Sequence, residues 1–127
     1  MKIEYYKIKG NNNSYTKFVP LKEFKVNGKI VKQDDRYIVE DNTTLNNLVL
    51  SSTRLNPGKE TTGHKHKGHE EIYFFVSGGG EMELDKDKFS VEPGDIVLVK
   101  DGAFHKVYNT TKQELYFICV LQGERQL

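Results

Sequence analysis

Short apolar runs separated by polar turns repeat along most of the chain. The runs are rich in valine, isoleucine, phenylalanine and tyrosine, and no stretch of ten or more residues has the period of an amphipathic helix. The turns carry glycine, proline, asparagine and aspartate, as in the segment 56–58. This pattern predicts an all-β fold of short antiparallel strands that close into a barrel. The expected strands are Tyr15 to Val19, Lys29 to Lys32, Tyr37 to Val39, Leu48 to Leu55, His64 to His66, Glu71 to Val76, Gly80 to Leu84, Lys88 to Val91, Ile96 to Val99, His105 to Tyr108 and Leu115 to Leu121.

Several of these strands are apolar on both faces. In Glu71 to Val76, odd positions share one face and even positions the other, and both sets hold aromatic or aliphatic side chains. The runs Ile96 to Val99 and Leu115 to Leu121 are similar. A solvated face of an antiparallel sheet should be polar, so we expect these strands to be covered on the outside as well. A second copy of the chain would supply that cover, and we predict a homodimer; the alternative is cover by strands within residues 1–44 of the same chain.

Length and charge narrow the class of protein. The chain has 127 residues, with 19 lysine and arginine residues against 18 aspartate and glutamate residues. This fits one domain, residues 1–127, with a single core. No basic tract favours nucleic acid or a membrane as partner, so a small-molecule ligand is expected. Residues 1–10 lack a long apolar run, which predicts a cytoplasmic protein, and Cys119 is interpreted as a reduced core thiol.

Candidate metal ligands gather between His64 and Glu71, where three of the four histidines occur with two glutamates. On a strand, His64 and His66 would point to the same face, so both imidazoles could approach one ion. The next strand could bring Glu71 to that ion, and His105 could add a third imidazole from a later strand. Three imidazoles and one carboxylate suit one divalent transition metal, Mn, Fe, Ni, Co or Zn. In an octahedral site, four protein ligands would leave two positions open.

A solvated surface loop is the alternative interpretation of this histidine cluster. Lys65 and Lys67 indicate that part of the segment faces water, although such lysines could also attract an anionic ligand. His69 is either a surface residue of the turn or a general base at the mouth of the site.

The spacing of these residues matches two motifs of a known family. The first motif, Gly, five residues, His-x-His, three or four residues, Glu, six residues and Gly, covers 58–78 and is met by Gly58, His64, His66, Glu71 and Gly78. The second, over 94–109, is met by Gly94, Gly102, His105 and Asn109, with Lys100 in place of a proline. The chain therefore resembles a small single-domain member of the cupin superfamily. The resemblance implies an antiparallel jelly-roll β-barrel around a metal ion held by His64, His66, Glu71 and His105.

Glu70 is the rival carboxylate for this metal set. Glu71 is preferred because it stands at the motif position before Gly78, and because Glu70 should point to the opposite face of the strand.

Side chains that share a face with Glu71 or His105 are expected to line the barrel interior: Tyr73, Phe75, Val107 and Asn109. Phe75 is interpreted as packing. Tyr73 is a candidate catalytic residue because a phenol near a metal can donate to a substrate oxygen or act as an acid, and His69 is the second candidate.

The sequence around the candidate metal ligands also suggests a class of function. The run Thr61 to His66 and the residues Glu71 to Tyr73 resemble cupin-type sugar-phosphate isomerases. This resemblance implies a metal-dependent isomerase or epimerase of a sugar or of an anionic sugar phosphate, in which the metal polarises a carbonyl and a base moves the proton. A mononuclear metal dioxygenase or decarboxylase, and a non-catalytic small-ligand-binding cupin, are the alternatives.

Overall fold

The computed structural model describes residues 24–65 and 67–123, and the regular secondary structure in them is entirely β. The prediction of an all-β fold is therefore confirmed for this part of the chain. The expected strand Tyr15 to Val19 lies outside the described residues. The strands are β1 Lys29–Gln33, β2 Tyr37–Asn42, β3 Leu48–Leu55, β4 Glu71–Ser77, β5 Gly80–Leu84, β6 Asp87–Val91, β7 Ile96–Val99, β8 His105–Tyr108 and β9 Leu115–Gln122.

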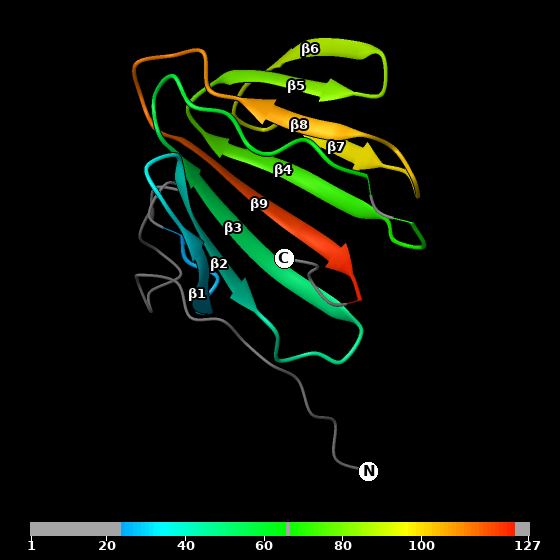
Figure 1. Cartoon of the computed structure of the whole chain (residues 1–127). Helices are drawn as coiled ribbons and strands as arrows, with labels where there is room; N and C mark the ends of the chain where they lie inside the picture. The colour runs from blue at the N-terminus through cyan, green and yellow to red at the C-terminus, as the bar shows by residue number, and fades with distance from the viewer. Residues whose placement is uncertain (1–23, 66, 124–127) are drawn as a thin grey trace.

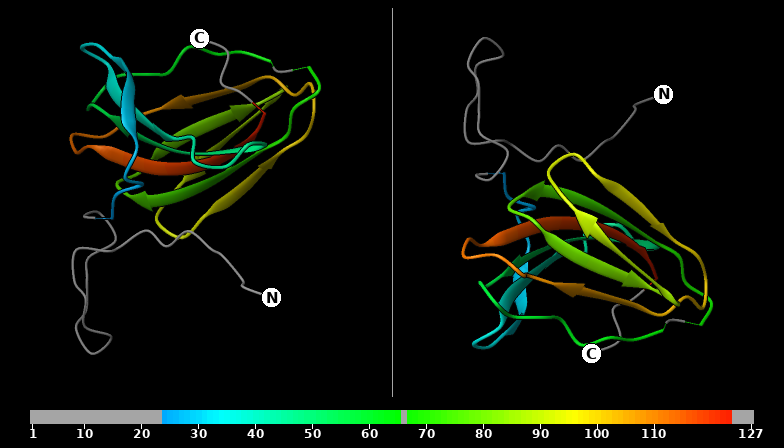
Figure 2. Two further views of the ribbon diagram at one scale, coloured as in Figure 1. Left: turned by 90° about the horizontal axis from the view of Figure 1, so that it is seen from below. Right: turned by 90° about the horizontal axis from the view of Figure 1, so that it is seen from above.

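The strands form two antiparallel sheets. The larger sheet has six strands in the order β1-β2-β3-β9-β4-β7, and the smaller has three in the order β6-β5-β8. Figure 1 shows the smaller sheet as a separate layer beside the larger one, and Figure 2 shows the same arrangement from below and above. Because β3 pairs with β9, and β9 with β4, strands far apart in the sequence lie side by side at the centre of the larger sheet.

The segment before β4 completes the smaller layer without forming a ladder of its own. It meets β8 through two isolated bridges, Glu60 with Tyr108 and His64 with His105. The expected strand His64 to His66 is thus wrong as a regular element: His64 makes a single bridge, Lys65 is outside any strand, and His66 is outside the described residues.

The early strands extend the larger sheet. β1 pairs with β2, and β2 pairs with β3 along its whole length, so both lie edge to edge with the barrel strands. The residues just before β1, in contrast, cross the outer face of the larger sheet. Tyr116 donates a hydrogen bond to the carbonyl of Phe24, and Asn42 donates one to the carbonyl of Val26, whose side chain is fully buried.

The core lies between the two sheets and follows the alternation of the strands. Phe75, Leu55, Met82 and Leu115 are fully buried in it, so the interpretation of Phe75 as packing is confirmed. Cys119 is a buried thiol of the same core. In the part of the chain that the structure describes, no helix is long and apolar enough to cross a membrane.

Candidate metal centre

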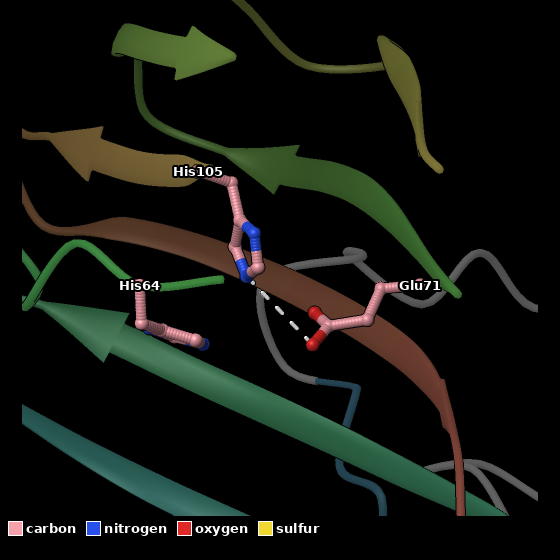
Figure 3. A group of neighbouring side chains, drawn as sticks. All are labelled: His64, Glu71 and His105. Carbon is pink, nitrogen blue, oxygen red and sulfur yellow. Dashed lines mark ion pairs between the residues drawn. The ribbon is translucent and has the colours of Figure 1, made fainter. Parts of the chain in front are cut away.

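Three potential ligands converge from three separate segments. His64 comes from the bridging segment, Glu71 is the first residue of β4 and His105 is the first residue of β8. Each offers a ligand atom, and these atoms all lie within 4.8 Å of one another. Figure 3 shows the two imidazoles and the carboxylate pointing toward a common point between the layers.

The spacing of the donor atoms fits a single transition-metal ion. Nε2 of His105 lies 3.7 Å from a carboxylate oxygen of Glu71. Metal–ligand bonds of about 2.0–2.2 Å place neighbouring ligand atoms about 3–4 Å apart, so this separation fits two ligands of one ion. The imidazole rings of His64 and His105 lie edge to face with centroids 4.4 Å apart, which also allows both to reach it. Two imidazoles and one carboxylate form a donor set that divalent transition metals accept.

The same local hydrogen bond orients both imidazoles. Nδ1 of His64 lies 3.0 Å from the carbonyl oxygen of Thr62, and Nδ1 of His105 lies 3.0 Å from that of Ala103. A carbonyl can only accept, so in the neutral rings the proton sits on Nδ1 and the Nε2 lone pair is available to an ion. Such outer hydrogen bonds fix the tautomer and orientation of metal-ligating histidines.

The segment that carries His64 is tied to the β1–β2 turn. Arg36 donates a 2.8 Å hydrogen bond to the hydroxyl of Thr62, and its guanidinium is held by the carboxylate of Asp34 at 2.8 Å. The guanidinium also lies over the ring of Tyr37, 4.5 Å from the ring centroid. Thr62 is therefore held from the larger sheet while its carbonyl orients His64.

Gly63 lets this segment approach β8 closely. A Cβ atom at this position would lie 2.3 Å from the ring of Phe104, so a side chain here would have to displace that ring. Glycine therefore permits the bridge between His64 and His105 that brings the two imidazoles together.

The centre is buried at one end and open at the other. The side chains of His105 and Glu71 are 1% and 6% exposed, whereas His64 is exposed. Burial lowers the pKa of His105 below its ordinary value, and the hydrogen bond to Ala103 and the charge of Glu71 oppose that shift. Burial therefore favours the neutral imidazole, which is the form that binds metals.

Comparison with known proteins shows the family to which the chain belongs. The family described as "Cupin domain" matches residues 51–121, which include all three converging side chains. The chain is a member of the cupin family. Its architecture is the jelly-roll barrel of that family, so the predicted fold is confirmed.

Two relatives by sequence and one by structure illustrate the range of similar proteins. This cupin is 31% identical over 94 residues to an uncharacterized protein of Methanocaldococcus jannaschii, covering 65% of this chain and 75% of that protein. It is 31% identical over 73 residues to an oxalate-binding protein of Thermotoga maritima, covering 58% of this chain and 60% of that protein. A sugar phosphate isomerase from Silicibacter pomeroyi superposes with a TM-score of 0.66 at 21% identity, over 71% of this chain and 61% of that one.

The structure brings together three of the four ligands expected for this cupin. His66 lies outside the described residues, so its place in the set stays a prediction. Glu71 is buried among the converging side chains, whereas Glu70 is exposed and its carbonyl accepts a hydrogen bond from the backbone of Gln122.

The two candidate catalytic residues are placed differently. The ring of Tyr73 is buried, with its centroid 5.8 Å from that of His105, and it stacks on Phe117 at 5.5 Å. His69 is not part of the converging group, and its ring lies against Gly123 beyond the end of β9. The geometry thus places Tyr73 beside the centre and His69 in the turn before β4.

Asn109 is buried, and its side chain is held by hydrogen bonds to the main chain and to Thr111. Its side chain is 2% exposed and donates to the carbonyls of Leu55 and Gln113, while its oxygen accepts from the backbone N–H and hydroxyl of Thr111. The amide is consumed by main-chain and turn hydrogen bonds. Asn109 is buried, and so is Val107, which belongs to the core. The hydrogen bonds of Asn109 give it a structural role in the turn after β8.

Sequence reasoning missed the groups that orient the histidines. The acceptors are main-chain carbonyls of Thr62 and Ala103, which any residue could supply, so no residue type marks them. Arg36 is 26 residues from Thr62 in the sequence, and only the barrel brings the two together. The one available signal was spacing, since each carbonyl lies two residues before its histidine.

Proposed function

We propose that this cupin holds one divalent transition metal ion through His64, Glu71 and His105, with His66 as a fourth ligand, and that the ion binds a small molecule through oxygen atoms. The observation that carries the proposal is the convergence of the ligand atoms of His64, Glu71 and His105 within 4.8 Å. Four protein ligands leave two positions of an octahedral ion for the small molecule.

Two open positions suit a ligand with two neighbouring oxygen atoms. A hydroxyl next to a carbonyl, as in an open-chain sugar, has this arrangement, and so do the two carboxylates of oxalate. A bound divalent ion would act as a Lewis acid toward such oxygens. The chain itself would supply orientation of the ligand and a proton donor.

We infer that the reaction is the isomerisation or epimerisation of a sugar or sugar phosphate. Support comes from Tyr73, whose buried ring lies beside His105 and could donate a proton or hydrogen bond to a substrate oxygen. The stacked ring of Phe117 on one side fixes the orientation of the phenol. The similarity to the Silicibacter pomeroyi protein described as a sugar phosphate isomerase agrees with this class, although it concerns the fold alone.

The experiment uses protein loaded in turn with Mn, Fe, Co, Ni or Zn and incubated with a panel of aldose and ketose phosphates. Interconversion is followed by NMR. Tyr73→Phe, which removes only the hydroxyl, should lower turnover while leaving metal occupancy unchanged. Failure of every metal form to interconvert any sugar in the panel would exclude the isomerase proposal.

Dicarboxylate binding is the second candidate, and the sequence relative described as an oxalate-binding protein favours it. Calorimetric titration of metal-loaded protein with oxalate should then show binding that disappears after removal of the metal by chelation. Oxalate binding without conversion of any sugar would favour the ligand-binding cupin over the enzyme. Oxygen consumption by an iron-loaded sample would instead favour a dioxygenase.

A further inference from the structure

A row of polar side chains crosses the inner face of the larger sheet beside the candidate metal centre. The register of β2, β3, β9 and β4 places four residues side by side in this row: Asp41, Ser51, Cys119 and Tyr73. All four are buried, with exposed fractions from 0% for Ser51 to 7% for Tyr73. We call these four residues the polar row. Its members carry a carboxylate, a hydroxyl, a thiol and a phenol.

Strand alternation shows that the polar row faces the core. Asp41 shares its face of β2 with Tyr37 and Val39, which belong to the core cluster. Ser51 shares its face of β3 with Val49, which belongs to the same cluster. The other two members of the row are part of that cluster themselves. The polar row therefore points into the barrel.

The row lies level with the candidate metal ligands. Tyr73 stands at its β4 end, and the centroid of its ring is 5.8 Å from that of His105. Glu71 lies one row away, on the same face of β4. The row on the opposite side of Tyr73 contains the aromatic pair Phe75 and Phe117. The polar side chains thus occupy the row next to the carboxylate ligand, and the interior becomes mainly apolar beyond it.

The segment that carries His64 lies on the side of the barrel where the polar row ends in Asp41. Thr62 accepts a hydrogen bond from Arg36 in the turn before β2, and β2 runs from this turn toward Asp41. The other segment runs from Thr62 to His64, where it bridges to His105. Both segments therefore run from the same contact toward the metal centre. The polar row extends from the Glu71 side of that centre to the His64 side.

The burial of Asp41 is a departure from ordinary core packing. An ionised carboxylate is costly to remove from water unless other groups bind it, and aspartate is rarely buried unless it is paired. Asp41 is 4% exposed, whereas the same face of β2 holds an apolar residue, Val39, two positions earlier. Ligand sites combine apolar walls with a few placed polar groups of this kind. A carboxylate has about four lone-pair sites, so Asp41 can serve a partner within the chain and also accept from a ligand.

We propose that Asp41 and Ser51 form a subsite for the hydroxyl groups of the small molecule that the metal holds. This inference rests on the proposed function, in which two neighbouring oxygens of that molecule occupy the open metal positions. A sugar has further hydroxyls beyond those two oxygens, and an ionised carboxylate accepts strong hydrogen bonds from them. The hydroxyl of Ser51 can donate or accept beside it.

The subsite distinguishes the two ligand classes of the proposed function. The ionised carboxylate of Asp41 only accepts hydrogen bonds, so it attracts hydroxyl groups and repels a second carboxylate. Neighbouring strands about 4.8 Å apart place Ser51 about 10 Å from Tyr73 along the sheet, a span that suits an extended sugar chain. The polar row therefore favours a polyhydroxylated ligand over oxalate.

The test compares the binding of glycolate and gluconate to the full-length, metal-loaded protein by calorimetric titration. Both acids offer the metal a carboxylate and the neighbouring hydroxyl, but only gluconate carries a chain of further hydroxyls. The ratio of the two affinities therefore measures the subsite, because the charge of the ligand is the same in both. The wild type should bind gluconate at least about tenfold more tightly than glycolate, which is the usual effect of one hydrogen bond to a charged group.

Two substitutions test the two members of the subsite. Asp41→Asn keeps the size of the side chain and removes its charge, so the ratio should fall at least about threefold, because a neutral hydrogen bond is about half as strong. Ser51→Ala should lower the ratio by a smaller factor. Thr53→Val is the matched control: Thr53 is a buried hydroxyl residue on the same face of β3, one row further from Glu71, and its loss should leave the ratio unchanged.

Thermal unfolding and elemental analysis show whether each variant is folded and loaded with metal. A ratio near one in the wild type would overturn the subsite, and so would a ratio that Asp41→Asn leaves unchanged. If Asp41→Asn does not fold, an unchanged ratio in Ser51→Ala decides against the subsite in its place. Loss of metal from folded Asp41→Asn would also overturn it, since Asp41 would then support the metal ligands. If the metal-loaded wild type binds neither acid, the proposed function itself fails, and the subsite fails with it.

Discussion

Asn109 offers a test of how the barrel holds the candidate metal centre in place. It follows β8, which carries His105, and its amide donates to Leu55 at the end of β3 over 2.9 Å and to Gln113 over 2.7 Å. Its oxygen accepts two further bonds from Thr111, at 3.0 Å and 2.9 Å. The bond to Leu55 joins the end of β8 to the larger sheet, and the other three fix the turn between β8 and β9.

Asn109→Ala removes all four bonds and leaves the carbonyl of Leu55 in a buried site without this donor. At about 0.5–1.5 kcal/mol for each hydrogen bond, the loss lies between about 2 and 6 kcal/mol. Thr111 is only partly buried and can bond to water instead, so the expected value is about 2–4 kcal/mol. A domain of this size has a total stability of about 5–15 kcal/mol, so the effect should be plain.

The assay is urea unfolding of metal-free wild type and variant, followed by circular dichroism at neutral pH. Asn109→Asp retains an acceptor for Thr111 but loses the donors to Leu55 and Gln113, so it should also destabilise the fold. Thr110→Ala, at an exposed position in the same turn, serves as the control and should change stability little. A loss below about 1 kcal/mol for Asn109→Ala would refute the proposed bridge between the sheets.

Three further predictions concern the centre itself. His105→Ala should sharply lower metal occupancy, measured by elemental analysis, whereas His69→Ala should not, and equal retention in both would contradict the assignment. Glu71→Gln should weaken metal binding in a competition titration by at least about tenfold, because it removes the anionic ligand, while Glu70→Gln should leave it nearly unchanged. In the metal-free protein, burial lowers the pKa of His105 below its ordinary 6.5, so the unfolded chain takes up the proton first as the pH falls. The contribution of His105 to stability should therefore be fully present above about pH 6.5 and decline below it. The substitution His105→Asn should flatten that decline. An unchanged urea midpoint in the wild type between about pH 7 and pH 5 would contradict this prediction.

The strand pattern could be predicted from the sequence because alternation and turn residues are local signals. Leu48 to Leu55, Gly80 to Leu84, Ile96 to Val99 and His105 to Tyr108 begin and end as predicted. The structure of the segment around His64 could not be predicted in this way. It pairs through isolated bridges, and these depend on β8 being next to it. A local pattern contains no information about such a neighbour.

The sequence alone also determined which residue types meet at the candidate metal centre, since motif spacing selects His64, Glu71 and His105. Only the tertiary structure decided how they are held. The Arg36 contact to Thr62 and the hydrogen bond from Asn109 to Leu55 join segments that are distant in sequence. The carbonyls that orient the imidazoles are close in sequence, but no residue type marks them. The outer face of the larger sheet shows the same division. Alternation predicts that Ile72 and Leu98 point outward, but only sheet order places them side by side and leaves them exposed.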